Sequence, residues 1–332
     1  LWKAKDRIRK AEIMSKDKWM LSAGHHHLFH IVAPIVARAR GYLEEEGAGE
    51  CDFFCSGSDA ITIEGMKEGR YHVGLDPKPF LVCGAKAQGA DLSIVGGWLN
   101  SPAYAFLAAR GRGINSLKDL RGKKVSVREP DGIDTRFSRA LFRREGLDAD
   151  QMVQWVVKGS RSRRFQQPLL DSGEADAAMI ISGDAAEMVK EGYPLLGDLS
   201  KVYPRGYAVR VTAATGDVVR DEPERLTGLL RALIRGYRFM NQRYRETMEI
   251  VQKAGYELDK DMDASLWEGK YHMFERIPPD GMVNEAGLEL VIEEEKAVGK
   301  LPGSFSVGDI LIDRFVKEAA DSVNRRFGKG CE

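Results

Sequence analysis

Short apolar runs alternate with amphipathic segments along residues 18–190. The runs have the length and composition of strands, and the segments between them repeat apolar residues at helical spacing. The predicted strands are 18–24, 51–57, 71–77, 91–99, 104–109, 123–127, 153–159, 175–181 and 206–214. Helices are predicted at 1–17, 30–47, 58–69, 164–173 and 182–192, from residue 135, and over most of the chain from 222 onward. This alternation predicts an α/β fold with mostly parallel sheets flanked by helices.

Several predicted strands end in small or polar residues that open the next helix. The stretches are SAGHHH, CSGSDA, VREPDGIDT, KGSRS and IISGDA. In open α/β sheets, ligands bind at the carboxyl ends of strands, where the N–H groups of helix N-termini favour anions and other acceptors. The repeated pattern predicts a binding cleft better than it predicts a single catalytic motif.

Composition and charge exclude some classes of protein. The 332 residues are 43% hydrophobic and 30% charged, with 50 Lys+Arg against 50 Asp+Glu. A net charge of zero gives no overall indication of nucleic acid or an anionic membrane as a partner. No apolar run of about 18 residues predicts a transmembrane segment. No signal peptide is recognisable, and because the chain opens on Leu1 the sequence does not decide export.

The four cysteines do not predict a disulfide framework. Cys51 and Cys55 fall in one predicted strand, so at ~3.3 Å per residue their Cα atoms are roughly 13 Å apart, too far for a bridge. No CxxC or HxxxH spacing accompanies them. We therefore expect neither a metal nor a cofactor.

The stretch GHHHLFH contains the most unusual candidate residues, His25, His26 and His27. They follow the first predicted strand, so they are candidates for contact with a ligand. Polar loop residues, a metal site and a catalytic base are the alternatives, since a histidine pKa near 6.5 suits a base. We expect His26 or His27 to face the cleft and His30 to pack on the following helix.

Other candidate ligand-binding residues also lie near the ends of predicted strands. They are Ser56, Ser58, Asp59, Asp76, Trp98, Glu129, Asp131, Thr135, Arg161, Arg163, Ser182 and Asp184. An arginine can clamp a carboxylate bidentately, and Trp98 can form an aromatic wall. The alternatives are helix capping for Ser58, a turn for Asp76, a solvated face for the arginines and core packing for Trp98.

Four stretches together resemble a known family. HIVAPIVARARGYLEEEG, CSGSDAITIEGMKEGRYHVGL, YAFLAARGRGINSLKDLRGKKVSVREPDG and LLDSGEADAAMII resemble substrate-binding proteins of the NMT1/THI5-like group, which includes sulfonate and pyrimidine-precursor binders. The resemblance covers roughly residues 18–300 and implies the two-lobed periplasmic-binding-protein fold of type II. It implies one lobe of residues 18–103 plus 211–332, a second of 104–210, and residues 1–17 as an N-terminal helical extension.

Two enzyme groups on this fold also share features with the chain. The pyrimidine synthases use a histidine after the first strand, but their CCCFC motif lies far downstream, whereas CDFFC stands at 51–55. RGINSLKDLRGKKVSVREPDG followed by VQWVVKG resembles 4,5-dihydroxyphthalate decarboxylase-like proteins, although the loop EPDGIDT differs from theirs.

The preferred interpretation is a solute-binding protein that holds a small polar or aromatic acid-like ligand in an interlobe cleft. It implies uptake with an ABC permease and a periplasmic or extracellular location. The alternative is a cytoplasmic lyase that decarboxylates an aromatic acid, with His26 and His27 as its catalytic candidates. A regulatory ligand sensor is a third possibility.

Overall fold

The chain is described by a computed structural model that covers residues 18–25, 28–130, 132–255 and 277–329. The extension predicted at 1–17 lies outside these residues. The described chain divides into two compact units, unit 1 with residues 18–101, 205–255 and 277–329, and unit 2 with residues 102–204. The sequence placed the second lobe boundary between 210 and 211, whereas this division falls between 204 and 205, so Arg210 lies in unit 1.

Unit 1 is built on a five-stranded sheet with the order β2-β1-β3-β10-β4. The strands are β1 (Lys18–Ala23), β2 (Glu50–Cys55), β3 (Val73–Gly74), β4 (Leu92–Leu99) and β10 (Arg210–Thr215). β1 runs parallel to β2 and β3, and β10 runs antiparallel to both β3 and β4. The first residue of β10 therefore lies at the edge where the parallel strands end.

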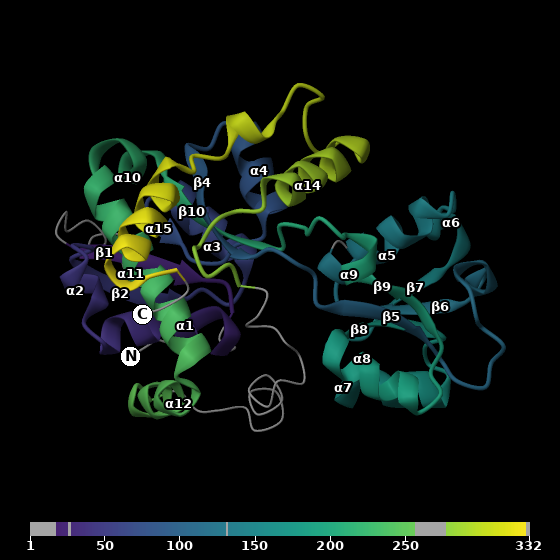
Figure 1. Cartoon of the computed structure of the whole chain (residues 1–332). Coiled ribbons are helices and arrows are strands. Elements are labelled where there is room, and N and C mark those ends of the chain that lie inside the picture. The colour runs from purple at the N-terminus through teal and green to yellow at the C-terminus, as the bar shows by residue number, and fades with distance from the viewer. Residues whose placement is uncertain (1–17, 26–27, 131, 256–276, 330–332) are drawn as a thin grey trace. The chain divides into compact units, whose positions relative to one another are not determined.

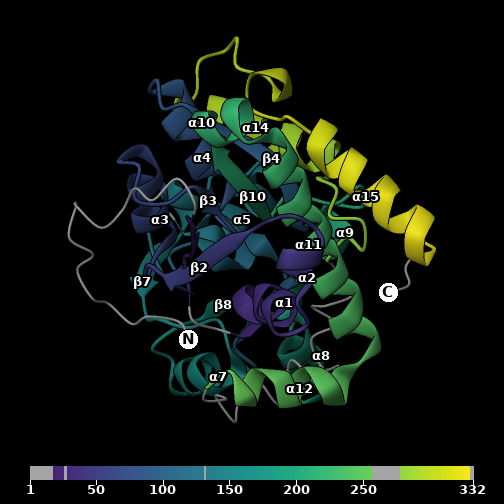
Figure 2. The same ribbon diagram turned by 90° about the vertical axis from the view of Figure 1, so that its left-hand side faces the viewer.

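Helices cover the sheet of unit 1 (Figure 1). They are α1 (Leu28–Ala39), α2 (Tyr42–Glu45), α3 (Asp59–Lys67), α4 (Pro79–Ala87), α10 (Gly216–Asp221), α11 (Pro223–Gln242), α12 (Tyr244–Lys253), α14 (Glu285–Ala297) and α15 (Arg314–Phe327), with a 3₁₀ turn at Val307–Asp309. α11 packs against α1 and α15 and runs along the side of the unit (Figure 2). Its buried stripe closes the core of the unit on that face.

Unit 2 repeats the same sheet plan, with the strand order β7-β6-β8-β5-β9. Its strands are β5 (Tyr104–Ala108), β6 (Lys124–Val127), β7 (Gln154–Val157), β8 (Ala177–Ile181) and β9 (Leu195–Asp198). Its helices are α5 (Ile133–Arg144), α6 (Ala149–Met152), α7 (Arg163–Ser172), α8 (Ser182–Lys190) and α9 (Leu199–Val202), with a 3₁₀ turn at Leu117–Leu120. β5 runs antiparallel between β8 and β9, as β10 does in unit 1.

Alternating side chains of β5 divide the core of unit 2 between its two faces. Ala105 and Leu107 pack with Leu170 of α7 and Met188 of α8. Phe106 points the other way, and its ring meets that of Phe142 in α5 edge-on. Successive side chains of a strand point to opposite faces, so one apolar strand can serve both helical layers.

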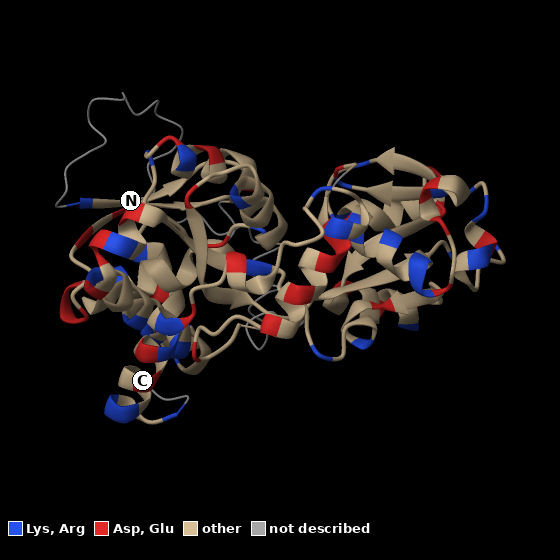
Figure 3. Ribbon diagram, turned by 90° about the horizontal axis from the view of Figure 1, so that it is seen from above, with Lys and Arg blue, Asp and Glu red and all other residues tan. Residues whose placement is uncertain are grey.

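The fold class predicted from the sequence is confirmed, and each predicted strand overlaps an observed one. The helices α4, α6, α9 and α10 and the strand β9 were not predicted. Charges of both signs are spread over both units (Figure 3). Among the described residues, no helix has an apolar stretch long enough to span a bilayer.

Gly97 of β4 allows a close backbone approach, and this gives a first prediction. A Cβ at this position would stand 2.2 Å from the carbonyl oxygen of Met282 and 2.8 Å from its carbonyl carbon. Because the obstacle is backbone, Gly97→Ala forces a local shift and should lower the free energy of unfolding by about 1–3 kcal/mol. Urea denaturation monitored by circular dichroism measures this loss.

Gly84→Ala is the matched control. Gly84 lies inside α4, and a Cβ there would meet nothing within 4 Å. Alanine in a helix interior is favoured over glycine by about 0.5–1 kcal/mol, so this variant should be slightly more stable than the wild type. Equal effects of the two substitutions would contradict the role given to the backbone contact at Gly97.

Candidate functional site

The carboxyl ends of the parallel strands in unit 1 bring together a group of charged side chains. Asp59 begins α3 after β2, and Asp76 follows β3. Arg210 reaches the same edge from the antiparallel strand β10, where it pairs with Leu99 at the end of β4. The topology thus places residues that are distant in sequence at one edge of the sheet.

A buried ion pair joins Asp59 and Arg210. Arg210 Nη1 donates to Asp59 Oδ1 over 2.6 Å, and the two side chains are 3% and 9% exposed. The same nitrogen donates to the backbone carbonyl of Asp76 over 3.0 Å. Removal of two charges from water is costly, and good geometry with additional hydrogen bonds is what offsets the cost.

The second oxygen of Asp59 faces two more basic side chains. Lys78 Nζ lies 3.3 Å and His25 Nε2 lies 3.6 Å from Oδ2. Among the described residues, this buried oxygen accepts no hydrogen bond of normal geometry. Burial alone would raise the pKa of Asp59, but Arg210, His25 and Lys78 outweigh burial and hold this pKa well below its ordinary range.

Asp76 forms a second pair, with His30 of α1. His30 Nδ1 bonds to Asp76 Oδ2, and the N–H of Gly24 donates to Oδ1 over 3.3 Å. Burial lowers the pKa of His30 more than Asp76 raises it, so the imidazole is neutral at neutral pH. His30 lies in α1, and its ring also bonds a fully buried carboxylate.

Gly24 is required where the chain leaves β1. A Cβ on Gly24 would stand 2.4 Å from Asp59 Oδ1 and 2.9 Å from the backbone nitrogen of Asp59. A side chain here would displace the carboxylate that pairs with Arg210. The small residue in the stretch SAGHHH thus makes room for the charged group.

Other predicted residues of unit 1 have different surroundings. His26 and His27 lie outside the described residues. Ser58 caps α3 by accepting from the N–H of Ile61 over 3.2 Å, and Ser56 Oγ bonds inside unit 1. Trp98 is 1% exposed and packs on Tyr237 with ring centroids 4.5 Å apart, which favours core packing over an aromatic wall.

Unit 2 carries a second group of polar residues after its strands. Arg161 Nη1 donates to Asp134 Oδ1 over 3.3 Å, and the N–H of Arg163 donates to Asp184 Oδ2 over 2.7 Å. Arg161 also lies over the ring of Tyr104 at 5.3 Å. Carboxylates and arginines are therefore paired with each other and with backbone at the start of α7.

The remaining predicted residues of unit 2 are less directly involved. Thr135 is buried, and its hydroxyl donates to the carbonyl of Glu129 over 2.6 Å, while the Glu129 side chain is exposed. Ser182 begins α8, and its N–H donates to Ala103. Asp131 lies outside the described residues.

Arg210 and Lys78 are the main residues that the predicted site lacked. Arg210 is the charged residue within the apolar strand GYAVRVTAA, and an arginine in a central strand is itself a signal of a buried partner. Lys78 follows Asp76-Pro77, where the sequence predicted a turn. Neither position reveals its carboxylate partner, because that partner, Asp59, lies in another element, at the start of α3.

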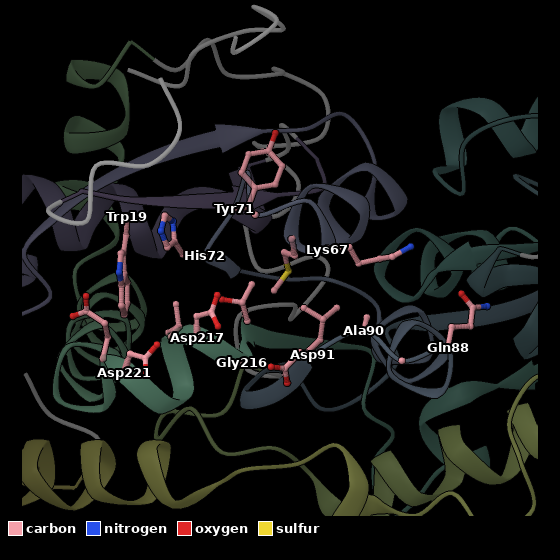
Figure 4. A pocket seen from close by; sticks show the side chains of 17 residues that line it. Trp19, Lys67, Tyr71, His72, Gln88, Ala90, Asp91, Gly216, Asp217 and Asp221 are labelled. Atoms are coloured by element: carbon pink, nitrogen blue, oxygen red, sulfur yellow. The ribbon is translucent and has the colours of Figure 1, made fainter. Parts of the chain in front are cut away.

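A pocket of about 790 Å³ lies at the opposite edge of the unit 1 sheet, at the start of β1 and β4 and the end of β10 (Figure 4). Trp19, His72, Asp91 and Asp217 are among the residues that line it. Asp91 is 56% and Asp217 is 83% exposed, and both pair with Arg220. These solvated pairs need no ligand, so we prefer the buried charges at the carboxyl edge as the site despite the size of this pocket.

Among the residues that the structure describes, no group of three His, Cys, Asp or Glu side chains is arranged to hold a metal ion. The described cysteines Cys51, Cys55 and Cys83 are buried free thiols. Burial raises the pKa of Cys51 and of Cys55 to about 11, so neither thiol is activated at neutral pH.

The ion pair gives a second prediction. Arg210→Met leaves Asp59 buried without its closest cation and should lower the free energy of unfolding by about 3–5 kcal/mol. The double variant Arg210→Met with Asp59→Asn should recover part of this loss, because it removes the uncompensated charge. Urea titrations of the wild type and both variants at pH 7 measure the two effects.

Arg220→Met is the control, because its pairs are solvent-exposed and should contribute little to the free energy of unfolding. The pH dependence adds an independent check. Since the folded-state pKa of Asp59 is depressed, its stabilisation is present above about pH 4 and is lost as the pH falls further. The difference in free energy of unfolding between the wild type and Arg210→Met should shrink in acid. A difference that does not depend on pH would contradict the stabilising role given to the pair of Asp59 and Arg210.

Solved structures similar to this chain include several periplasmic binding proteins. The sulfonate-binding protein SsuA of Methylobacillus flagellatus has a TM-score of 0.70 and 14% identity, covering 92% of this chain and 94% of that one. SsuA of Escherichia coli, an aliphatic sulphonate binder, has a TM-score of 0.66 and 15% identity, covering 90% of this chain and 93% of that one. The nitrate-binding protein NrtA of Synechocystis has a TM-score of 0.62 and 14% identity, covering 92% of this chain and 89% of that one. These likenesses establish the periplasmic binding protein fold.

A curated relative is 30% identical over 90 residues, the 4-amino-5-hydroxymethyl-2-methylpyrimidine phosphate synthase of Schizosaccharomyces pombe. The matched segment spans 27% of this chain and only 25% of the relative. A family model described as NMT1/THI5 like matches residues 29–246, which is more than half of the chain. The chain therefore belongs to the NMT1/THI5-like family.

Proposed function

We propose that the protein is a solute-binding protein that holds a small polar ligand at the carboxyl edge of unit 1. The observation that carries the proposal is the buried group of Asp59, Asp76, Arg210, Lys78 and His25. Perturbed, partly desolvated charges gathered at strand ends are typical of a ligand site in an open α/β sheet. The sulfonate and nitrate binders with this fold support a binding role.

Two side chains of this group are accessible to a ligand. The side chains of Lys78 and His25 are 13% and 15% exposed, while Asp59 between them is buried. An ammonium has several N–H donors, so Lys78 can bond Asp59 and a ligand acceptor together. An acid-like ligand would be held by Lys78 and His25, and delivery to an ABC permease follows from this role.

The third prediction tests this site with a fixed set of probes. The set contains ethanesulfonate, nitrate, 4-amino-5-hydroxymethyl-2-methylpyrimidine and 4,5-dihydroxyphthalate, each titrated by calorimetry. We expect saturable binding of at least one probe. Lys78→Met should weaken that binding about tenfold or more, because a hydrogen bond to a charged group contributes about 1.5–3 kcal/mol.

Lys67→Met is the matched control, because Lys67 lies at the far end of α3 and pairs with the exposed Glu64. Its affinity should equal that of the wild type. An equal loss of affinity in both lysine variants, or no loss of affinity in Lys78→Met, would contradict a ligand site at the carboxyl edge of unit 1. Absence of binding by every probe would count against the solute-binding function.

A decarboxylating lyase is the second candidate, and the His30–Asp76 pair favours it. A buried carboxylate bonded to Nδ1 orients an imidazole, as required of a general acid or base. Loss of carbon dioxide from an aromatic carboxylate leaves a carbanion that takes up a proton. With Nδ1–H bonded to Asp76, the neutral ring of His30 has a bare Nε2, which can take a proton from water and pass it to the carbanion. Release of carbon dioxide from 4,5-dihydroxyphthalate by the wild type, abolished in His30→Gln, would support this candidate over the first.

A further inference from the structure

The two units repeat a set of polar side chains as well as a sheet order. Ser22 and Ser126 each occupy the last position but one of their strand, β1 and β6. The segments that follow the neighbouring strands read SGSDAIT at 56–62 and SRSRRFQ at 160–166. Thr62 of α3 follows Ser22, and Gln166 of α7 follows Ser126, by the same number of residues. Thr62 therefore corresponds to Gln166.

In unit 1 these side chains form a closed hydrogen-bond network. Ser22 Oγ lies 3.0 Å and Ser56 Oγ lies 2.8 Å from Thr62 Oγ1. Ser56 Oγ also bonds to the carbonyl of Ser58 over 2.8 Å. Every hydroxyl in this network has a partner, so the network needs no ligand or water.

In unit 2 the corresponding network is open. Gln166 Nε2 donates to the carbonyl of Ser160 in the loop before α7, which directs the amide toward the start of that helix. Gln166 Oε1 and Ser126 Oγ have no hydrogen-bond partner among the residues that the structure describes, although both side chains are only 1% exposed. A buried acceptor without a donor is unfavourable, and such groups in native proteins call for an explanation.

The strand register brings both open groups to one face. Ser126 pairs with Val156 and Ala178, and those residues pack with Leu170 of α7. Gln166 is buried one helical turn before Leu170, toward the carboxyl edge of the strands. The open acceptors thus lie under the loop 158–162, at the edge where open α/β sheets bind ligands.

We propose that Gln166 Oε1 and Ser126 Oγ form a subsite for a hydrogen-bond donor of the ligand, such as an amino or amide N–H. The inference rests on the proposed function, because the ligand is a small solute of the same class. A donor is required because the amide N–H of Gln166 is already used by Ser160 and its carbonyl is the open group. Because both side chains are buried, the proposal requires the loop 158–162 to shift when a ligand group enters. Gln166 is then the residue that selects solutes with a donor over solutes without one.

Two pairs of probes that differ by one donor test this subsite. They are taurine with ethanesulfonate, and 4-amino-5-hydroxymethyl-2-methylpyrimidine with its 4-desamino analogue. In the wild type, the amino member of the pair that binds should bind at least about tenfold more tightly, the effect of one hydrogen bond to a buried acceptor. In Gln166→Thr, which introduces the residue of unit 1, the preference should fall to within about twofold while the melting temperature stays the same or rises.

Gln166→Met is a second variant, since it keeps the length of the side chain and removes the acceptor. Thr62→Ser in unit 1 is the control and should keep the preference for the amino member of the probe pair. No preference in the wild type, or a preference that survives in both Gln166 variants, would overturn the subsite. An ordered water bridging Ser126 and Gln166 in a ligand-saturated crystal would also overturn it, as a structural water site only. Failure of every probe to bind would instead count against the solute-binding function, and so the two failures are distinguishable.

Discussion

The buried pair between Asp59 and Arg210 constrains the arrangement of unit 1. It joins the first turn of α3 to the first residue of β10, two positions separated by 151 residues. β10 enters the sheet only after the chain returns from unit 2, so the pair forms when both ends of unit 1 are in place. Burial of these charges in turn requires the glycine at position 24 and the basic side chains beside Asp59.

A buried charge is not in itself evidence of a ligand site, and a second group in unit 1 illustrates the difference. Glu46 accepts from Arg235 over 2.7 Å, from Arg231 over 3.1 Å and from Arg326 over 2.6 Å. These bonds join the end of α2 to α11 and α15, away from the carboxyl ends of the strands. Both oxygens of Glu46 accept hydrogen bonds, whereas Asp59 Oδ2 has only ion pairs, with Lys78 and His25. This full pairing favours a structural role for Glu46, whereas Asp59 belongs to the group on which the proposed function rests.

The fold was predictable because apolar runs and capped helices alternate along the chain. α4 escaped prediction because prolines at 77 and 79 and a glycine at 84 disguise its helical pattern. β9 escaped because it is a short edge strand, and an edge strand needs little apolar sequence. In the site, Asp59 and Asp76 were predictable as residues after strands, but Arg210 required the antiparallel insertion of β10, which no local pattern encodes.

The two units share a sheet plan, but under the functions proposed here they use it for different chemistry. In unit 2 the carboxylates of Asp134 and Asp184 accept from backbone N–H groups near the helix starts, so their charge is used locally. In unit 1 the carboxylates face Arg210, Lys78 and histidines, and the basic groups that hold them also line the site. Under the proposed function, the basic groups of unit 1 therefore bind the acidic group of a ligand. Unit 2 lacks the hydroxyl that closes the network in unit 1 and has at that position an amide whose carbonyl is open. Under the inference above, this open carbonyl gives unit 2 a preference for hydrogen-bond donors.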